Sequence, residues 1–534
     1  MLTGSNSGVE KVAVIDLFAG PGGLGEGFAQ FHDDRLRFEV ALSVEKDPVA
    51  VKTLRLRKFF RNFGRRDVPE AYYDYIRNPD CDVAGLASAY PAEWKNASEG
   101  VLPLTLGSPD LDQKGLEKQI RAAIGDASTW ILVGGPPCQA YSLVGRSRMR
   151  GEDPDQFMRD HRHTLYREYL RILAKFLPPL FVMENVKGLL SSKLGGVTAF
   201  EQIKKDLSDP RLALGDTAST PYTILPITQY GARDLFANEF APSDYVVRSE
   251  LHGVPQARHR VILVGVRHDL SRKAMLRSMK ANEKLVSVRD AIGDLPRLRS
   301  RLSGEEDSFK AWTKVVRDAA RTCQKLGLQT DGLAAWCRST PPFANDPGLG
   351  ARFQRSRRKP KVLLDWLYDE RLGGVVNHEA RGHIREDLAR YLFVAAFAQM
   401  HGRSPTLRDF PRELLPEHKN ARSRTTKDSI PFSDRFRAQR WDSPSTTVTS
   451  HISKDGHYFI HPDVVQCRAL TVREAARLQT FPDNYFFEGN RTQQYHQVGN
   501  AVPPYLAFQI AKSVAEVLRA SEALGDRPRR RTVV

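Results

Sequence analysis

Residues 12–25 read VAVIDLFAGPGGLG, an apolar run that ends in a glycine-rich turn. The opening run, Val12–Ile15, is too short for a helix and predicts a buried strand. Gly20–Gly25 then forms the pattern G-x-G-x-x-G, and helical sequence follows over Glu26–Phe31. A second strand is expected over Phe38–Val44. This order of strand, glycine turn, helix and strand is typical of nucleotide-binding α/β domains.

A carboxylate lies in register with this glycine turn. Glu45 follows Gly25 by twenty residues and closes the second predicted strand. Glycines let a cofactor approach the backbone closely, and an acid at this position can accept hydrogen bonds from a ribose. On these residues alone, a nicotinamide dinucleotide and S-adenosylmethionine remain open as cofactors, because both carry an adenosyl ribose.

The pattern continues along the first half of the chain. Further strand-like runs occur at Trp130–Val133, Leu180–Met183 and Arg260–Val266, and a helix is expected over Thr164–Phe176. Strands that alternate with helices predict an α/β fold with a doubly wound, Rossmann-like, mostly parallel sheet. The last helix, expected over Tyr505–Arg519, carries an apolar stripe and should return to this sheet.

The composition excludes several classes of protein. The 534 residues are 41% hydrophobic and 27% charged, as in globular domains. The longest clean apolar run, Tyr391–Ala398, has eight residues, whereas a membrane span needs about 20. Five cysteines without a C-x-x-C pair exclude a disulfide framework, and no secretory signal pattern is present. We therefore expect a reduced, cytoplasmic protein. The net charge of +17 fits either a nucleic-acid partner or a basic surface that is only solvated.

One cysteine stands in an unusual setting. Residues 134–139 read GGPPCQ and follow the strand predicted at Trp130–Val133. Two prolines make a rigid loop at the carboxyl edge of the sheet, where open α/β folds place their ligands. A lone cysteine is most often a small buried hydrophobe, but this setting predicts that Cys138 is a nucleophile. The remaining cysteines are expected to be structural: Cys81, Cys323, Cys337 and Cys467.

The order of several short motifs along the chain resembles that of the DNA (cytosine-5)-methyltransferases. These motifs are Asp16–Gly23 (DLFAGPGG), Gly134–Gln139 (GGPPCQ), Glu184–Val186 (ENV), Gln256–Arg260 (QARHR), Arg468–Asp483 and Gln497–Pro503 (QVGNAVP). The resemblance spans nearly the whole chain. It implies a class I methyltransferase domain over residues 1–285 and 488–534, and an irregular DNA target-recognition domain over 286–487.

The resemblance also implies a reaction and its residues. The Cys138 thiolate would add to C6 of a flipped cytosine, and Glu184 would share a proton with N3. Arg260 and Arg258 would hold the base carbonyl and a flanking phosphate. The methyl group would come from S-adenosylmethionine, in a pocket of the following residues: Phe18, Gly20, Gly22, Gly23, Leu24, Glu45, Asn500 and Val502.

Other residues are expected at the DNA. The resemblance assigns this role to Gln139, Ser142, Arg146, Arg148 and Gln256. One departure from the family pattern concerns its Gly-Asp segment, whose nearest match here is Gly107–Asp110 (GSPD). The contact to the adenine amino group therefore stays unassigned.

Two basic runs and one histidine motif carry weaker signals. Ala351–Lys361 has six basic residues in eleven and suits phosphate contacts, whereas Lys52–Arg66 fits phosphate contacts or an amphipathic helix with its aromatic residues in the core. His378–His383 (HEARGH) differs from a zincin motif because its second histidine is one residue late. A further possible set, His451, His457, His461 and Cys467, lacks paired short spacings, so no metal is predicted.

The sequence thus predicts an enzyme that methylates C5 of cytosine in a specific duplex DNA sequence. The alternatives are a tRNA cytosine-5 methyltransferase and a catalytically silent DNA-binding homologue. We expect a monomer that works on the nucleoid of a prokaryotic cell, with a cognate restriction endonuclease or defence-system protein as a possible partner.

Overall fold

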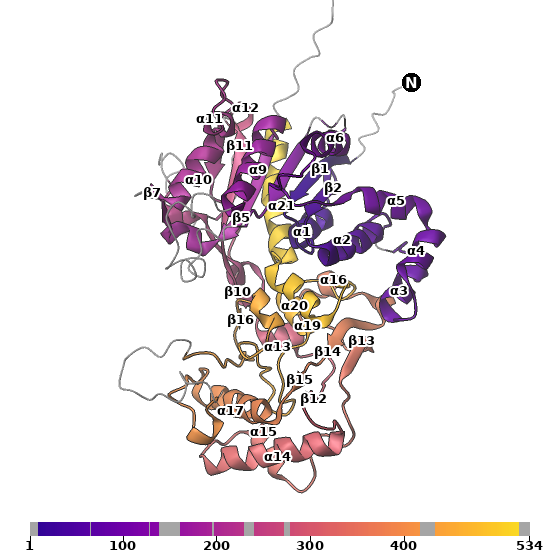
Figure 1. The fold of residues 1–534 in the computed structure, drawn as a ribbon, viewed down its shortest axis with the longest axis vertical. Helices are drawn as coiled ribbons and strands as arrows, with labels where there is room; N and C mark the ends of the chain where they lie inside the picture. The colour runs from indigo at the N-terminus through magenta and orange to yellow at the C-terminus, as the bar shows by residue number, and fades with distance from the viewer. Residues whose placement is uncertain are drawn as a thin grey trace, which may run out of the picture.

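The computed structural model describes most of the chain, namely residues 9–64, 66–125, 127, 129–137, 161–194, 197–228, 240–271, 278–416 and 433–522. Two lobes lie one above the other along its long axis (Figure 1). The upper lobe holds a large sheet, the lower lobe is mainly helical, and a layer of short helices joins the two.

The sheet confirms the predicted α/β fold. Its strands follow the order β3-β2-β1-β4-β5-β11-β8, and β9 pairs with β11. The first five strands in that order are parallel, whereas β11 runs antiparallel to β5, β8 and β9. The bounds of these strands are β1 Glu10–Leu17, β2 Leu36–Glu45, β3 Val101–Pro103, β4 Trp130–Gly134, β5 Leu180–Val186, β8 Tyr222–Leu225, β9 Val246–Arg248 and β11 His259–Arg267.

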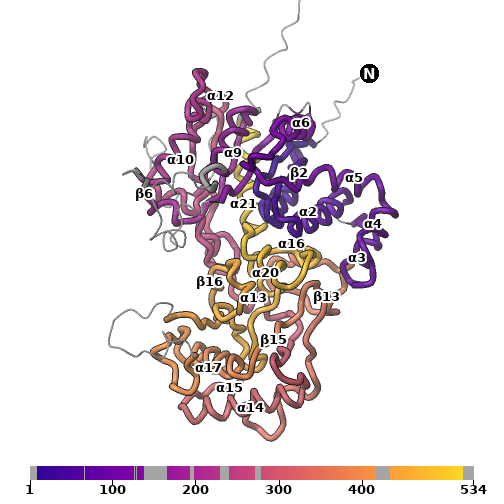
Figure 2. Tube along the Cα trace, in the orientation of Figure 1, coloured from indigo at the N-terminus to yellow at the C-terminus, as the bar shows by residue number. Residues whose placement is uncertain are grey.

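Helices cover both faces of this sheet. One apolar core packs the sheet against α1 (Gly23–Gln30) and α21 (Pro504–Glu522). The core on the other face packs it against α6 (Gln113–Ile124), α9 (His161–Phe176) and α10 (Ala199–Ser208). The C-terminal helix α21 therefore returns beside the N-terminal helix α1, as predicted from its apolar stripe (Figure 2).

A helical insert connects β2 to β3. It contains α2 (Pro48–Arg61), α3 (Glu70–Arg77), α4 (Val83–Ala89) and α5 (Pro91–Glu99). Phe59 and Phe60 are buried in an aromatic core with residues of this insert and of the lower lobe. The basic run over Lys52–Arg66 is thus largely an amphipathic helix, the second of the two interpretations that the sequence leaves open.

The lower lobe is more regular than predicted. It has its own core around α14 (Phe309–Lys325), α15 (Asp331–Cys337) and α17 (Arg385–His401). Short strand pairs connect this core to the junction: β12 (Arg301–Leu302) with β15 (Gly382–His383), and β13 (Gly350–Arg355) with β14 (Gly374–Glu379). The irregular part of residues 286–487 is the set of long connections between these elements.

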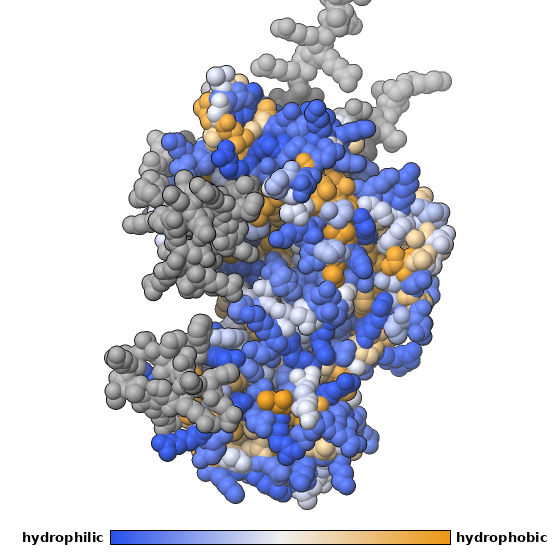
Figure 3. All heavy atoms as spheres, in the orientation of Figure 1, coloured by the Kyte–Doolittle hydropathy of each residue, from blue (hydrophilic) through white to orange (hydrophobic). Residues whose placement is uncertain are grey.

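The junction between the lobes has a separate apolar core. It is built from α13 (Val288–Ile292), α19 (Val472–Leu478) and α20 (Arg491–Asn500), with residues near Val448. The predicted domain boundary after residue 487 falls inside this core, because Phe487 and Tyr495 both belong to it. The face of the molecule seen in Figure 3 is mostly hydrophilic.

The remaining elements are short. They are β6 Lys193–Leu194, β7 Val197–Thr198, β10 Gln256–Ala257, β16 Ser445–Thr446, α11 Pro210–Ala213, α12 His268–Ser271, α16 Leu364–Leu367 and the 3-10 turns η2 Lys187–Ser191, η3 Pro242–Tyr245, η4 Ser249–His252, η5 Glu370–Leu372, η6 Arg412–Leu414 and η7 Ser450–Ser453. None of the described helices has the length and apolar character that a membrane-spanning segment requires.

Candidate active site

An ion pair joins the carboxyl end of β5 to β11. Glu184 and Arg260 lie on adjacent antiparallel strands, where Glu184 is opposite Ile262 and Arg260 is opposite Val186. Because side chains alternate along a strand, this register puts both on one face of the sheet. Arg260 Nε lies 2.8 Å from Glu184 Oε1, and both side chains are 13% exposed. Burial lowers the pKa of the Arg260 guanidinium, and the Glu184 carboxylate opposes that shift.

The loop that leads to Cys138 lies against this pair. A Cβ atom placed on Gly135 would be 3.0 Å from Glu184 Oε2, so this glycine allows the loop to approach the carboxylate. Asn185 Nδ2 donates to the Pro136 carbonyl over 3.3 Å, which anchors the loop to the end of β5. The loop that precedes the expected nucleophile is therefore fixed beside the expected acid. Five predicted residues lie outside the described part of the chain: Cys138, Gln139, Ser142, Arg146 and Arg148.

The glycine turn is hydrogen-bonded to Glu45. The backbone N–H of Gly20 donates to Glu45 Oε2 over 2.8 Å, while Glu45 Oε1 accepts from the N–H groups of Lys46 and Asp47 at 2.9 Å. A carboxylate has about four lone-pair sites, so these three bonds leave acceptor capacity for a ligand hydroxyl. Gly20 has φ +56°, and a Cβ atom placed on it would meet nothing within 4 Å. Open space thus lies directly above the turn.

The C-terminal segment closes on the same turn. A Cβ atom on Gly23 would lie 2.1 Å from the Val502 carbonyl oxygen, so these backbones pack in direct contact. Phe18 adopts φ +56° at the entry to the turn. Asn500 is exposed at the end of α20, and its amide lies 3.2 Å from His496 Nδ1. Val502 and Glu45 therefore both contact the glycine turn, whereas the Leu24 side chain is buried in the core under α1.

Arg258 is hydrogen-bonded to the junction between the lobes. Its side chain is buried, and Nη1 donates to the Val448 carbonyl at 2.7 Å and to the Gly499 carbonyl at 3.4 Å. Burial holds the pKa of this guanidinium well below its usual value. Both Nη atoms donate to backbone carbonyls of the junction, while Nε is buried without a hydrogen-bond partner. These contacts favour a positioning role for Arg258 over the predicted contact with base or phosphate.

Gln256 also differs from its prediction. The sequence places this residue at the DNA, whereas its side chain is fully buried. Its Nε2 donates to Gln479 Oε1 at 3.0 Å and to the Leu478 carbonyl at 3.2 Å, and its Oε1 accepts from the Val448 N–H at 2.7 Å. Both ends of the amide are occupied inside the protein, which corrects the DNA-binding assignment. Gln256 instead ties β10 and β16 to the junction.

Comparisons with known proteins bear on this arrangement. Residues 110–211 and 234–516 match the family described as C-5 cytosine-specific DNA methylase. The chain is 34% identical over 521 residues to the type II methyltransferase M.Bpa9945I of Bacillus paralicheniformis, covering 95% of this chain and 99% of that protein. It is 27% identical to the DNA (cytosine-5-)-methyltransferase M.ApeKI of Aeropyrum pernix, over 96% of this chain and all of that protein.

This chain belongs to the C-5 cytosine-specific DNA methylase family. It is accordingly a DNA (cytosine-5)-methyltransferase. A solved E. coli structure, described as a DNA modification methyltransferase encoded within a prophage, shares the fold with a TM-score of 0.50 at 18% identity, over 95% of this chain and 99% of that one.

Two residues of the methylase site carry no prediction from the sequence. Gln479 extends the Gln256 contact, since its Nε2 donates to the carbonyls of Val498 and Ala501 at 2.7 and 3.3 Å. Asp16 lies buried in β1, and its Oδ2 has no hydrogen-bond partner. Burial raises the pKa of the Asp16 carboxyl to about 7, although Arg61 acts in the opposite direction. The sequence feature that could have identified Asp16 is a carboxylate directly after the apolar run Val12–Ile15.

His378, the first histidine of the zincin-like motif, has structural partners. His378 is fully buried between the Thr471 hydroxyl and the Pro296 carbonyl, each 2.9 Å from a ring nitrogen. Burial lowers its pKa to about 4. Within the described residues, no group of three or more His, Cys, Asp or Glu side chains is arranged to hold a metal ion.

Proposed function

We propose that this methylase transfers a methyl group from S-adenosylmethionine to C5 of a cytosine flipped out of a specific duplex DNA sequence. The observation that carries the proposal is the Glu184–Arg260 pair, held against the Gly135–Pro136 loop that leads to Cys138. It combines an acid, a planar cation and the approach to a thiol at one edge of the sheet.

In this proposal the base is activated by three residues. The Cys138 thiolate forms a bond to C6. The electron pair of the C5–C6 double bond then shifts toward C5 and, by conjugation, toward N3. Glu184 shares a proton with N3 as negative charge develops there. Arg260 donates to the cytosine carbonyl and orients the Glu184 carboxylate. Once C5 has gained its methyl group, loss of the C5 proton re-forms the double bond and expels the Cys138 thiolate, so the enzyme is regenerated.

The residues at the glycine turn fit the adenosyl cofactor. The remaining acceptor capacity of Glu45 suits a ribose hydroxyl, and the open space above Gly20 suits close approach of the ligand to the backbone. Val502 and Asn500 would close the pocket from the C-terminal side. When bound, S-adenosylmethionine supplies an electrophilic methyl group on a sulfonium.

The lower lobe suits recognition of duplex DNA. A base inside a duplex cannot reach a site at the sheet edge, so flipping is part of the proposal.

We further propose that the methylase acts as a monomer on the nucleoid of a prokaryotic cell. The similarity to type II methyltransferases supports a cognate restriction endonuclease as a partner.

Base-resolution mapping of 5-methylcytosine tests the proposal in a methylation-free host that expresses this chain. The expected result is methylation at one short DNA motif, absent with Cys138→Ser. Methylation of tRNA without DNA would favour the RNA-directed alternative. Methylation by the Cys138→Ser variant would overturn the covalent mechanism.

A further inference from the structure

Strand β2 carries one extra residue where it pairs with β1. Val14 lies opposite Val40. The next residue of β1, Ile15, lies opposite Leu42, so Ala41 has no counterpart and forms a β-bulge. A bulge bends its strand and redirects the side chains that follow it, which is why bulges are frequent beside active sites.

The bulge exchanges the two faces of β2. Before it, Val40 belongs to the core that packs against α1, whereas Leu42 and Val44 after it belong to the core on the opposite face. Since side chains alternate along a strand, Glu45 would point to the face of α6 if the extra residue were absent. With the bulge, Glu45 reaches the glycine turn and accepts from the Gly20 N–H at 2.8 Å.

Apolar burial alone does not hold this bulge in place. Both faces of the sheet are covered by apolar cores, so Leu42 and Val44 would be buried on either side. A shift of β2 by one residue is therefore not opposed by the exposure of a hydrophobic side chain. The register needs a further determinant, and the neighbouring helix α2 supplies one.

Lys58, in α2, donates to the bulge. Its Nζ lies 2.7 Å from the Val40 carbonyl oxygen and 3.1 Å from the Ala41 carbonyl oxygen. The side chain is buried, and this burial lowers the pKa of its ammonium group to about 8. Hydrogen bonds from a charged donor are stronger than those from a neutral one, so Lys58 stabilises the two carbonyls at the point where the regular pairing is interrupted.

A glycine makes room for the Lys58 side chain. A Cβ atom on Gly100 would lie 2.0 Å from Lys58 Cε and 2.6 Å from Nζ. Gly100 has φ −79°, a value open to any residue, so the lysine and not the backbone conformation accounts for this glycine. The Gly100 carbonyl also accepts from the Ser43 N–H at 2.9 Å, which joins the start of β3 to β2 beyond the bulge.

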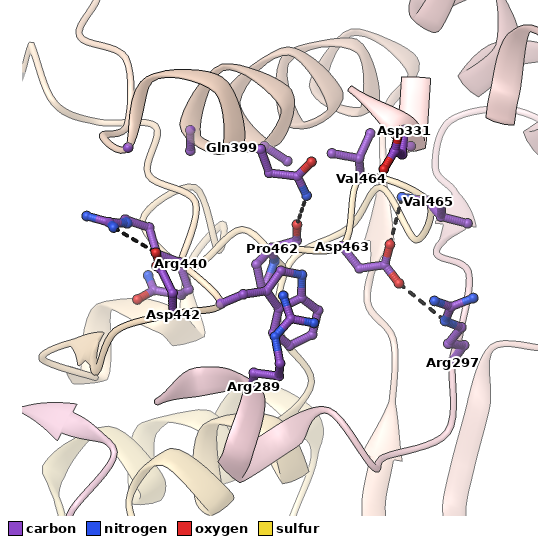
Figure 4. A pocket seen from close by; sticks show the side chains of 16 residues that line it. Arg289, Arg297, Asp331, Gln399, Arg440, Asp442, Pro462, Asp463, Val464 and Val465 are labelled. Atoms are coloured by element: carbon purple, nitrogen blue, oxygen red, sulfur yellow. Dashed lines mark hydrogen bonds and ion pairs between the residues drawn. The ribbon is translucent and has the colours of Figure 1, made fainter. Parts of the chain in front are cut away.

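The partners of Lys58 are carbonyls and not carboxylates. By contrast, Arg297 pairs with Asp463 at 3.3 Å in the pocket lined by α13, α15 and α17 (Figure 4). Glu39, the acid that acts on Lys58, pairs instead with Lys11 at 2.7 Å. Within the described part of the chain, the Lys58 ammonium group has no carboxylate within ion-pair distance, so its contacts are those to the bulge.

We infer that Lys58 is a positioning residue for cofactor binding, because its bonds to the bulge at Ala41 keep Glu45 directed at the glycine turn. The inference rests on the proposed function, in which Glu45 accepts from the ribose of S-adenosylmethionine. It gives α2 a role in cofactor affinity without any contact to the cofactor.

Two variants displace the ammonium group in different ways. Lys58→Met removes it, whereas Gly100→Ala keeps it and forces the lysine side chain away from the bulge. Gly100→Ala adds only a methyl group at an ordinary φ, so it should remain folded even where Lys58→Met does not, and thermal unfolding verifies this. Lys95→Met, on the exposed surface of α5, is the matched control.

Two measurements follow the carboxylate. Calorimetric titration gives the affinity for S-adenosylmethionine, which should fall about tenfold or more in Lys58→Met and Gly100→Ala. Hydrogen exchange of the full chain without cofactor gives the protection of the Gly20 amide, which should exchange about tenfold faster because its acceptor has moved. Lys95→Met should keep the wild-type value of both.

A double-mutant cycle separates positioning from a general loss of structure. With Glu45→Ala already in place, Lys58→Met should weaken cofactor binding by less than about threefold, because the group that it positions is gone. An equal loss with and without Glu45→Ala would overturn the inference, as would wild-type exchange at Gly20 in both variants. Wild-type cofactor affinity of Glu45→Ala would instead refute the proposed cofactor site, while exchange at Gly20 would still decide whether Lys58 positions Glu45.

Discussion

Arg260 Nε lies 2.8 Å from Glu184 Oε1, and the other carboxylate oxygen, Oε2, faces Gly135. The pairing of β5 with β11 positions both residues, so the orientation of the carboxylate is set by the sheet. One oxygen is held by a cation, while the other is directed to the loop that leads to Cys138. Glu184 can therefore keep one geometry while its free oxygen meets the base.

Glu184→Gln should reduce kcat by about 10²- to 10⁴-fold, because an amide cannot exchange a proton with N3 of the cytosine. Affinity for DNA and S-adenosylmethionine should change little, since the substitution preserves shape. Single-turnover methyl transfer on a duplex with the target motif measures the effect. The companion variant Arg260→Lys loses the planar donor fork and should reduce kcat about tenfold or more. A Glu184→Gln enzyme with wild-type kcat would contradict the assigned role.

Gln256→Ala should lower the free energy of unfolding by about 1–3 kcal/mol, because it leaves buried groups of Val448 and Gln479 without their partner. It should also raise the KM for DNA, since the contact ties the junction to β10, which leads into the strand that carries Arg260. Urea unfolding and steady-state kinetics measure the two effects. Gln202→Ala, whose exposed amide bonds only Asp206, is the control and should cost less than about 0.5 kcal/mol. A KM equal to that of the wild type would argue against a positioning role.

β5 and β11 show which features of the fold the sequence predicts: the strands themselves, but not how they pair. Both are short apolar runs, so their existence as strands follows from local pattern. Their antiparallel pairing depends on chain segments far apart, and no local pattern encodes it. The same limit applies to Gln256 and Arg258. Their motif predicts contacts with DNA and with the base, because a motif gives only the identity of its residues. Their hydrogen bonds to Val448 and Gly499 form only when distant segments of the chain come together. The sequence patterns do not predict α17, whose stretch Tyr391–Ala398 is buried throughout and so lacks an amphipathic stripe. They do not predict α14 either, although the buried residues of that helix repeat at helical spacing.

Asp16→Asn should stabilise the methylase above neutral pH and have little effect near pH 4. Burial raises the pKa of Asp16 from 3.8 to about 7, so between these values the folded state binds the proton that the unfolded state has released. The stability of the wild type therefore falls as pH rises through this window and levels off above pH 7. The asparagine removes this term, worth up to about 4 kcal/mol at 1.36 kcal/mol per pKa unit.

Urea unfolding at pH 5 and pH 8 distinguishes this behaviour, and the difference between variant and wild type should grow at the higher pH. Asp34→Asn, at an exposed turn, provides the control and should show no such growth. A constant difference at both pH values would mean that Asp16 does not titrate in this range.

Gly20→Ala and Gly23→Ala separate binding of the cofactor from folding. At Gly20 a Cβ atom meets nothing within 4 Å, so the cost to stability is the strain of a positive φ, about 1 kcal/mol. The added methyl group enters the space assigned to S-adenosylmethionine and should weaken its binding about tenfold or more. At Gly23 the Cβ atom would lie 2.1 Å from the Val502 carbonyl oxygen, so the C-terminal segment must move, and both stability and binding should fall.

Calorimetric titration with S-adenosylmethionine, alongside thermal unfolding of each variant, measures both properties. The decisive result is Gly20→Ala, because its fold should remain while its cofactor affinity drops. If Gly20→Ala bound S-adenosylmethionine as the wild type does, the open space above the turn would not be the cofactor site, whatever happened at Gly23. Glu45→Gln then provides an independent check, since it keeps the shape of the side chain but weakens the acceptor for a ribose hydroxyl.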